Sequence, residues 1–484
     1  MSRINSNVPS LIAQRHLGIS QRALRTSLER LASGLRINRG ADDPAGLIVS
    51  ERLRSEIAVV NQAVANSERA INVIATTEGA LDEVQALLTD IQALLVEAAN
   101  SGAFSDDEIA ANQLQVDNAI ESITRIANTT TFAGRKLLNG ELDYVTSGIV
   151  STELTDVSVL GAKFGSLAYV GVDVAVSQSA QQAELRFAGP GLGVSGATLE
   201  VRGPDGVITL TFPASATSVD MVQAINRQVD DTGVIAVLSG TNGSAGMRIQ
   251  SLEYGSNAFV SVDQQETNGS FQVVDRTDAV NSRTPGRDAV ATINGIATTA
   301  DGLKLSYSSS LLKLDVVIAE TFGNGSSGLG TSSFAITEGG ALFQLGPQVT
   351  TSLQENIGVK SMQANKLGNA VVGYLSELKS GQSKSLLSKN FQQGSKIVQE
   401  VITQVAVLRG RLGAFERNTL QPNINQLQIT TENLTSSESV IRDTDFATET
   451  SELTRSQILV QAGNSILAIA NAQSQNVLTL LGGR

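Results

Sequence analysis

The sequence predicts an α+β protein: long helices from both chain ends form a discontinuous coiled-coil rod, with a mainly-β module inserted between them. Aromatic residues are absent before Phe104 and after Phe446, and both ends carry aliphatic residues at helical spacing. Four of the eight prolines fall between Pro190 and Pro285, so turns concentrate in the middle of the chain. Helical flanks around a turn-rich centre therefore bring the two termini together.

The terminal helices, residues 1–43 and 450–484, are the outermost expected elements. Leucines recur at spacings of 7, 4, 3 and 4 near the N-terminus, and apolar residues recur at spacings of 7 near the C-terminus. This is the seam of a coiled coil. We expect the two ends to pair with each other and to contact other chains through these residues: Leu17, Leu24, Leu28, Leu31, Leu35, Leu453, Val460, Leu467 and Leu478.

A long helix is expected from Pro44 to just before Gly102. Asp43 is suited to cap free backbone amides, and proline fits the first helical position. Aliphatic residues then occupy most of the successive heptad core positions. The neighbouring carboxylates Asp42 and Asp43 also resemble a metal site or an acid–base pair, but helix capping explains them more simply.

Further helices complete the expected rod. Ser105–Glu108 reads as a capping box that opens a second helix, and residues 129–140 read as a turn or hairpin. Apolar residues from Ile397 to Leu412 predict a long amphipathic helix on the C-terminal side. We assign residues 44–179 and 336–449 to this helical rod core.

The middle of the chain, residues 180–335, predicts strands. Residues 197–201 and 207–212 alternate apolar and polar side chains around the turn-forming segment Gly203–Gly206, which predicts a hairpin. Further short apolar segments follow, separated by Gly, Ser and Thr. We expect a β-rich module made of two small units, residues 180–268 and 269–335.

Composition excludes several functions. The chain has 484 residues, a net charge of −12, no cysteine and one histidine, His16. An acidic surface argues against nucleic acid as a partner, and the absence of cysteine removes disulfides, thiol catalysis and the common zinc sites. The sequence contains neither a cleavable signal peptide nor a membrane-length apolar run. We expect a structural protein and not an enzyme, with no cofactor or bound metal.

Several segments of the two flanks resemble one family. The N-terminal flank contains Leu28–Asn38, LERLASGLRIN, followed by Ala41–Leu47, ADDPAGL. The C-terminal flank repeats the match in the segments Leu408–Phe415, Glu432–Ser439, Ile441–Phe446, Arg455–Gln461 and Asn476–Gly482. Together these segments resemble the conserved blocks of bacterial flagellin over roughly residues 1–140 and 340–484.

The resemblance implies a subunit that polymerises into the bacterial flagellar filament, outside the cell. It implies that residues 1–43 and 450–484 line an inner tube, that the rod core forms an outer tube, and that residues 180–335 are exposed. Its implied partners are further copies of the chain, the type III export apparatus, an export chaperone at the C-terminal helix, and the filament cap and hook-junction proteins. Two alternatives remain: a hook–filament junction protein, and an enzyme in the middle domain.

The chain ends are expected to become ordered on assembly. The apolar stripes of residues 1–40 and 450–484 are too narrow to offset an ordering cost of about 1–2 kcal/mol per residue in an isolated chain. Burial against neighbouring subunits supplies the missing stabilisation. Each subunit then offers a heterologous, non-closing interface, which generates an open helical polymer.

The resemblance also locates a segment that a vertebrate innate receptor recognises in typical flagellins. That segment reads Gln-Arg-Val-Arg-Glu-Leu in those proteins, and Thr89–Leu94 takes its place here. Leu94 is kept, Asp90 stands where an arginine is expected, and Gln115 stands about where an acidic residue is expected. The charge inversion at position 90 implies weak recognition.

Overall fold

The computed structural model divides the chain into two compact units. The structure describes residues 7–100, 102–165, 167–192, 196–239, 246–265, 271–320, 322, 330–370 and 372–482, with side chains as far as residue 473. The terminal unit comprises Met1–Arg69, Gln344–Val349 and Arg417–Arg484, and the central unit comprises Ala70–Phe343 and Thr350–Glu416. The helical ends and the mainly-β centre confirm the predicted fold class.

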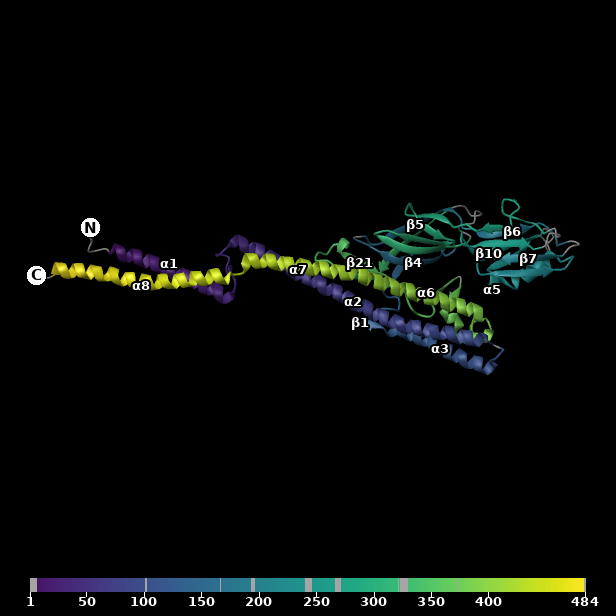
Figure 1. The fold of residues 1–484 in the computed structure, drawn as a ribbon, viewed down its shortest axis with the longest axis horizontal. Helices are drawn as coiled ribbons and strands as arrows, with labels where there is room; N and C mark the ends of the chain where they lie inside the picture. Colours follow the sequence, from purple (N-terminus) through teal and green to yellow (C-terminus); the bar gives the residue numbers. More distant parts are fainter. Residues whose placement is uncertain are drawn as a thin grey trace. The chain divides into compact units, whose positions relative to one another are not determined.

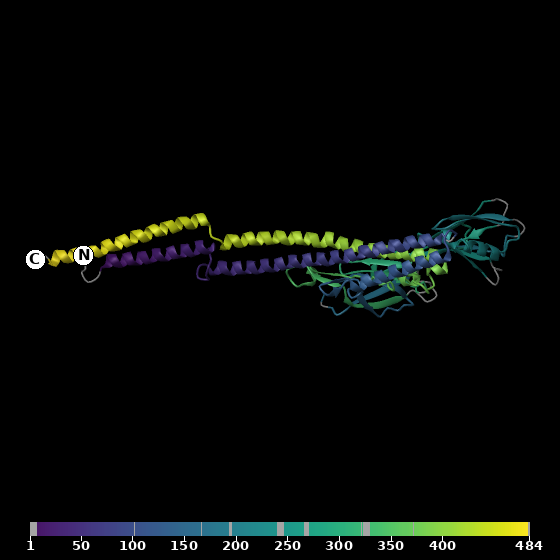
Figure 2. The same cartoon turned by 90° about the horizontal axis from the view of Figure 1, so that it is seen from below.

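Two helices from opposite chain ends form one part of the terminal unit. Helix α1 (Val8–Ser33) and helix α8 (Phe446–Gly482) lie side by side in both views of Figures 1 and 2. The Asn7 side chain accepts from the Ser10 amide at the start of α1, and Gly34 ends the helix in the left-handed conformation.

Helix α2 (Pro44–Ala99) confirms the expected long helix. Its buried positions alternate in steps of three and four residues, as a heptad seam requires. From Val60 onward the buried set is Val60, Ala63, Ser67, Ala70, Ile74, Thr77, Leu81, Val84, Leu88, Ile91, Leu95 and Ala98. In the terminal unit, Val60 and Ala63 pack with Leu427 of helix α7 (Gln421–Arg442).

Helices α3 (Asp106–Thr129) and α6 (Phe391–Phe415) belong to the central unit. The predicted capping box at Ser105 and Glu108 is present, and β1 (Thr131–Phe132) and β2 (Arg135–Lys136) confirm the predicted hairpin. The apolar residues expected between Ile397 and Leu412 are buried on one side of α6. A π-helical turn, Glu416–Leu420, separates α6 from α7.

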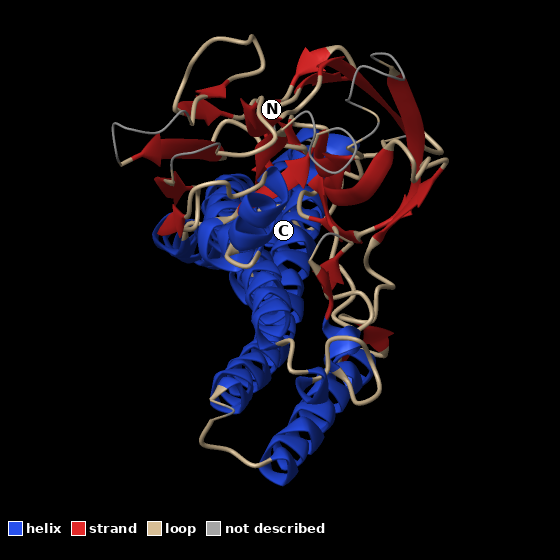
Figure 3. Ribbon diagram, turned by 90° about the vertical axis from the view of Figure 1, so that its right-hand side faces the viewer, coloured by secondary structure: helices blue, strands red, loops and turns tan. Residues whose placement is uncertain are grey.

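The first β unit, residues 144–181 and 287–339, packs two antiparallel sheets around one core. Figure 3 draws strands in red and helices in blue. Its sheets have the strand orders β15-β14-β5-β19-β3 and β16-β17-β18-β4. The strands are β3 (Tyr144–Ser147), β4 (Leu154–Ala162), β5 (Val170–Gln178), β14 (Val290–Ile293), β15 (Ile296–Ala297), β16 (Thr299–Asp301), β17 (Lys304–Ser308), β18 (Leu312–Ile318) and β19 (Thr331–Gly339).

The inserted β unit, residues 182–286, has its own core and sheets β12-β6-β10-β9 and β13-β11-β7-β8. It contains β6 (Gln182–Phe187), β7 (Ala197–Arg202), β8 (Val207–Phe212), α4 (Ser218–Asn226), α5 (Val229–Thr232), β9 (Val234–Leu238), β10 (Met247–Tyr254), β11 (Phe259–Gln264), β12 (Val273–Val274) and β13 (Arg283–Pro285). Gln181 and Arg287 exchange backbone hydrogen bonds of 2.8 and 2.9 Å where the chain enters and leaves.

These strands correct two predicted boundaries. The β module begins at Tyr144, not at residue 180, so residues 144–179 are not part of a helical rod. The β units are also nested, not consecutive, because the first unit is completed by strands on both sides of residues 182–286. Sequence periodicity identifies strands, but the pairing of β5 with β14 and β19 depends on contacts far apart in the chain.

The segment from residue 336 to 390 requires a further correction, because its described residues form no long rod helix. It contains β20 (Ala341–Gln344), β21 (Gln354–Ile357), β22 (Gly368–Asn369), β23 (Gly373–Tyr374) and the short 3-10 helices Thr351–Leu353, Leu375–Leu378 and Leu386–Ser388. The absence of proline between residues 348 and 421 suggested helix. Gly368, Gly373 and Gly381 supply positive φ values instead, so glycine breaks the helix there.

Candidate self-assembly surface

Helices α1 and α8 run antiparallel and are tied at both ends of their contact. The Asn7 side chain donates to the carbonyl of Ala470 at 2.9 Å, and the Ser10 hydroxyl lies 2.8 Å from the Asn471 side-chain oxygen. Arg30 pairs with Glu449, at 3.5 Å, near the other end. The contact therefore joins residues near the N-terminus to residues near the C-terminus.

The most deeply buried positions of this helix pair are small. Ser10, Ala13 and Ser27 are buried on α1, and Ser456 and Ala470 are buried on α8; the one larger buried side chain in the described part of the pair is Glu449, the partner of Arg30. A Cβ atom at Gly463 would lie 3.2 Å from the Leu17 side chain, so the absence of a side chain at Gly463 permits close approach. Small residues let the two backbones pack closely, which leaves most of the larger apolar side chains at the margin.

The predicted seam residues divide into three groups. Leu17, Leu24, Leu31, Leu453, Val460 and Leu467 lie half-buried in the alternating three-and-four pattern of the α1–α8 contact. Leu28 is 47% exposed, outside that contact, and Leu35 lies beyond the end of α1, where it forms a β-bridge with Asp443. Leu28 and Leu35 thus lie outside the helix seam of the single chain, and their contact with other chains stays a prediction; the side chain of Leu478 lies outside the described residues.

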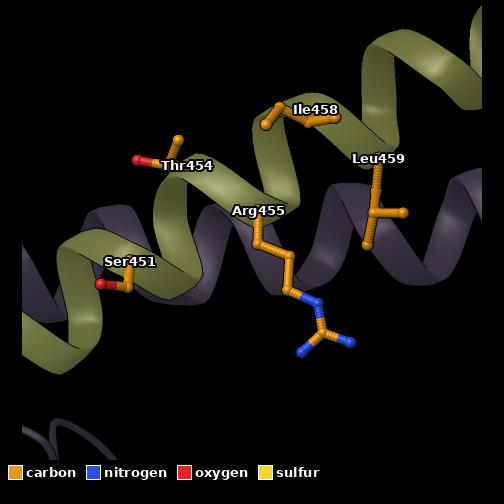
Figure 4. Close-up of a pocket in the computed structure, with 5 residues that line it drawn as sticks. All are labelled: Ser451, Thr454, Arg455, Ile458 and Leu459. Carbon is orange, nitrogen blue, oxygen red and sulfur yellow. The ribbon is translucent and has the colours of Figure 1, made fainter.

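Large apolar side chains remain exposed on the outer faces of the pair. On α1 the exposed set is Val8, Leu11, Ile12, Ile19 and Leu28, and on α8 it is Phe446, Ile458, Leu459, Ile466 and Ile469. Figure 4 shows a shallow groove on α8 lined by Ser451, Thr454, Arg455, Ile458 and Leu459, with Arg455 and Leu459 on the same side of the helix. We call the exposed large apolar residues of α1 and α8 named above the outer apolar surface. Sequence periodicity alone did not identify this surface.

The connectors beside the helix pair are held by backbone hydrogen bonds. The Arg36 amide donates to the Arg442 carbonyl at 2.7 Å, and the Thr444 amide donates to the Gly34 carbonyl at 2.9 Å. Ile37 is fully buried beside them. These contacts fix where α1 ends and where α8 begins.

Of the two carboxylates before α2, Asp43 caps the helix and Asp42 holds the turn that precedes it. Asp43 accepts from the Gly46 amide at 2.9 Å. Asp42 accepts from the Arg39 amide at 2.8 Å and from the Asn38 amide at 3.1 Å. The Arg39 hydrogen bond is the main reason that the pKa of Asp42 lies below its usual value. Within the described ranges, no group of three His, Cys, Asp or Glu side chains is placed to bind a metal ion.

The remaining predicted positions lie elsewhere. His16 is exposed on α1. Asp90 is exposed on α2, with the half-buried Leu94 one turn further along, and Gln115 is exposed on α3. No helix in the described part of the chain is both long enough and apolar enough to cross a membrane.

Comparison with known proteins decides the family. A family model described as the bacterial flagellin N-terminal helical region matches residues 4–143, and one described as the C-terminal helical region matches residues 395–481. The flagellin of Salmonella typhimurium is 31% identical over 524 residues, covering 99% of this chain and 99% of that protein. The chain belongs to the bacterial flagellin family.

Other flagellins match over a similar length. The B-type flagellin of Pseudomonas aeruginosa is 28% identical, covering 99% of each chain. The solved structure of FliC from Burkholderia pseudomallei shares 15% identity and covers 72% of this chain and 99% of that one; its TM-score of 0.24 is too low to support an argument. Flagellins are structural proteins, and this chain is a structural subunit of the flagellar filament, which lies outside the cell. The full-length matches do not favour a hook–filament junction protein.

Proposed function

We propose that α1 and α8 carry the main contacts between subunits of the filament, and that they line its inner tube. The outer apolar surface supports this proposal, because no other described part of the chain covers it. Ile458, Ile466 and Ile469 are each more than half exposed on α8. Burying one such side chain contributes about 1.5–3 kcal/mol, so a row of them favours association with a second copy.

Assembly also stabilises the two terminal helices in this account. The α1–α8 contact buries mainly small side chains, which contribute little hydrophobic free energy. Docking on the filament end buries the outer apolar surface and so adds the larger side chains to the packed interface. Seeded growth of a chain that lacks residues 450–484 tests the proposal: we expect no filaments, and normal filaments would contradict it.

The remaining domains follow from the same arrangement. We propose that the α2, α3, α6 and α7 helices form the outer tube and that the two β units form the outer surface of the filament. The subunit has no enzymatic role in this account. Export proceeds through the type III apparatus, and a chaperone covers the exposed side chains of α8 before assembly. The filament cap and the hook-junction proteins contact the same terminal helices.

We propose that the vertebrate innate receptor recognises this chain weakly, and that Asp90 is the residue that limits its affinity. The side chain is exposed, so a negative charge is presented where typical flagellins present an arginine. We expect monomeric Asp90→Arg to activate receptor-bearing reporter cells at lower concentration than the parent. A desolvated arginine contact contributes about 2 kcal/mol, or roughly thirtyfold in affinity.

A matched charge change elsewhere separates this effect from general electrostatics. Glu121 is exposed on α3, and Glu121→Arg makes the same change in net charge as Asp90→Arg. We expect Glu121→Arg to leave potency unchanged. Equal potency of Asp90→Arg and the parent would show that position 90 is not limiting, and would direct attention to Gln115.

A further inference from the structure

Two connectors link the α1–α8 helix pair to the rest of the terminal unit, and we call them together the joint (residues 34–43 and 443–445). Leu35 and Asp443 form a β-bridge, closed by the two backbone hydrogen bonds of 2.7 and 2.9 Å described above. Ile37 is fully buried beside them. The joint therefore holds two segments from opposite flanks of the chain together, at the point where α1 ends and α8 begins.

Helices α2 and α7 anchor the joint independently of α1 and α8. A Cβ atom at Gly46, in the first turn of α2, would lie 2.7 Å from the Ile37 side chain, so the missing side chain lets Ile37 pack there. Arg442, the last residue of α7, donates to Glu51 of α2 at 2.9 Å. We therefore expect the joint to stay formed while α1 and α8 fluctuate in the unassembled chain.

The two ends of the α1–α8 contact are held differently. Next to the joint, Asp445 caps α8 by accepting from the Ala447 and Thr448 amides at 2.9 and 3.2 Å, and the buried Glu449 pairs with Arg30. At the other end, the described residues join the two helices through side-chain hydrogen bonds and through no backbone hydrogen bond. The main-chain connection between the two helices therefore lies at one end of their contact.

A contact that is tied at one end orders from that end. The first turn of a helix is costly to form, and each later residue adds a hydrogen bond at lower cost. Bringing two segments together also costs less entropy when the free chain between them is shorter. The joint places the last turn of α1 beside the first turn of α8, whereas Ser10 and Asn471 are separated from it by nearly the full length of two fluctuating segments. Pairing is therefore most favourable beside the joint.

We infer that the joint nucleates the helix pair, so that α1 and α8 order from the joint outwards as a subunit docks. The Arg30–Glu449 ion pair forms early, and the contact between Ser10 and Asn471 forms last. The part of the outer apolar surface nearest the joint then contacts the filament before the part furthest from it. The inference rests on the proposed filament role, but it concerns the order of events within one subunit.

Hydrogen exchange of the unassembled full chain, sampled from milliseconds and followed by mass spectrometry, tests the direction of ordering. In the parent, protection of the backbone amides should be highest beside the joint, at Arg30 and Glu449, and should fall steadily towards Ser10 and Asn471. Strand β10 serves as the folded reference, because it belongs to the separate core of the inserted β unit. Uniform exchange along both helices would overturn the proposal.

Two matched variants test whether the joint is the nucleus. Ile37→Ala removes the buried side chain of the joint and should speed exchange along the whole of both helices, by about tenfold, with β10 unchanged. Ile48→Ala makes the same change at a 65% exposed position of α2 and should leave the exchange profile as in the parent. Equal effects of the two variants would contradict a role of the joint.

A variant at the far end gives the opposite case. Asn7→Ala removes the hydrogen bond to Ala470 and should speed exchange only in the neighbouring turns, leaving the amides beside the joint as in the parent. If Asn7→Ala lowers protection beside the joint as much as Ile37→Ala does, the pair orders as one unit and the proposal is wrong. These outcomes do not depend on filament growth, so the deletion of residues 450–484 tests the filament role separately.

Discussion

A chain that lacks residues 450–484 is expected to remain folded but to form no filaments. The deletion removes most of α8 and with it Ile458, Ile466 and Ile469 of the outer apolar surface. The two β units keep their own cores, since neither core contains a residue of α8. Circular dichroism should report retained strand content, and negative-stain microscopy after seeding should show seeds that do not grow. Filaments of normal length would contradict the terminal-helix account.

Point variants separate the outer apolar surface from the helix itself. Ile458 is 61% exposed and lines the groove of Figure 4, so it contributes little to the fold of the single chain. Ile458→Asp should raise the critical concentration for polymerisation about thirtyfold, the equivalent of roughly 2 kcal/mol of lost apolar burial. Ile458→Leu keeps the apolar volume and should polymerise like the parent. Similar behaviour of the two variants would exclude this side chain from the interface.

Excising the inserted β unit is expected to leave both the fold and polymerisation intact. Gln181 and Arg287 already form a pair with two backbone hydrogen bonds, so replacing residues 182–286 with Asn-Gly should close a hairpin there. The first β unit loses the packing of Tyr254 against its core and two hydrogen bonds, from the Ser256 amide to Asp288 at 2.9 Å and from the Asn257 side chain to Asp301 at 3.1 Å, but it keeps every strand of its two sheets. We expect thinner filaments by electron microscopy and a modest fall in melting temperature.

A second deletion serves as the matched control. Removing residues 180–335 takes away β14 and β18 and leaves β4 and β5 without their partners. That chain should bind a hydrophobic dye and lose cooperative unfolding of the first β unit, because its core is divided. If the shorter excision also unfolds, then the inserted unit is part of the first unit's core and the nested arrangement is incorrect.

Local sequence signals predicted the elements well where one segment determines its own structure. The capping box at Ser105, the hairpin around Gly203–Gly206 and the heptad pattern of α2 each depend on neighbouring residues, and each is present. The nested β units depend on pairing between strands such as β5 and β19, which lie more than a hundred residues apart. No local pattern encodes that pairing, so the boundary at residue 180 was misplaced.

The contact between α1 and α8 shows a second limit of prediction from the sequence. The spacing of large aliphatic residues identified Leu17 and Leu24 but did not reveal Ser10, Ser27 and Gly463. These three residues occupy positions of the same heptad where the two helices approach each other closely. Small residues have little hydrophobicity, so an apolar pattern does not reveal them. Ser27 and Gly463 lie three and four residues from predicted seam residues, and Ser10 lies one heptad before Leu17, so this spacing was the available signal. Leu28 shows the converse, because it fits the leucine spacing and yet remains exposed.

Hydrogen exchange of the unassembled chain and of filaments, followed by mass spectrometry, tests the central claim most directly. The account predicts that the backbone amides of Val8–Ser33 and Phe446–Gly482 exchange faster in the unassembled chain and become protected in the filament. Amides in the core strands of the inserted β unit, such as β10, should exchange alike in both states. Equal protection of α1 and α8 before and after assembly would contradict the claim that these helices carry the contacts between subunits.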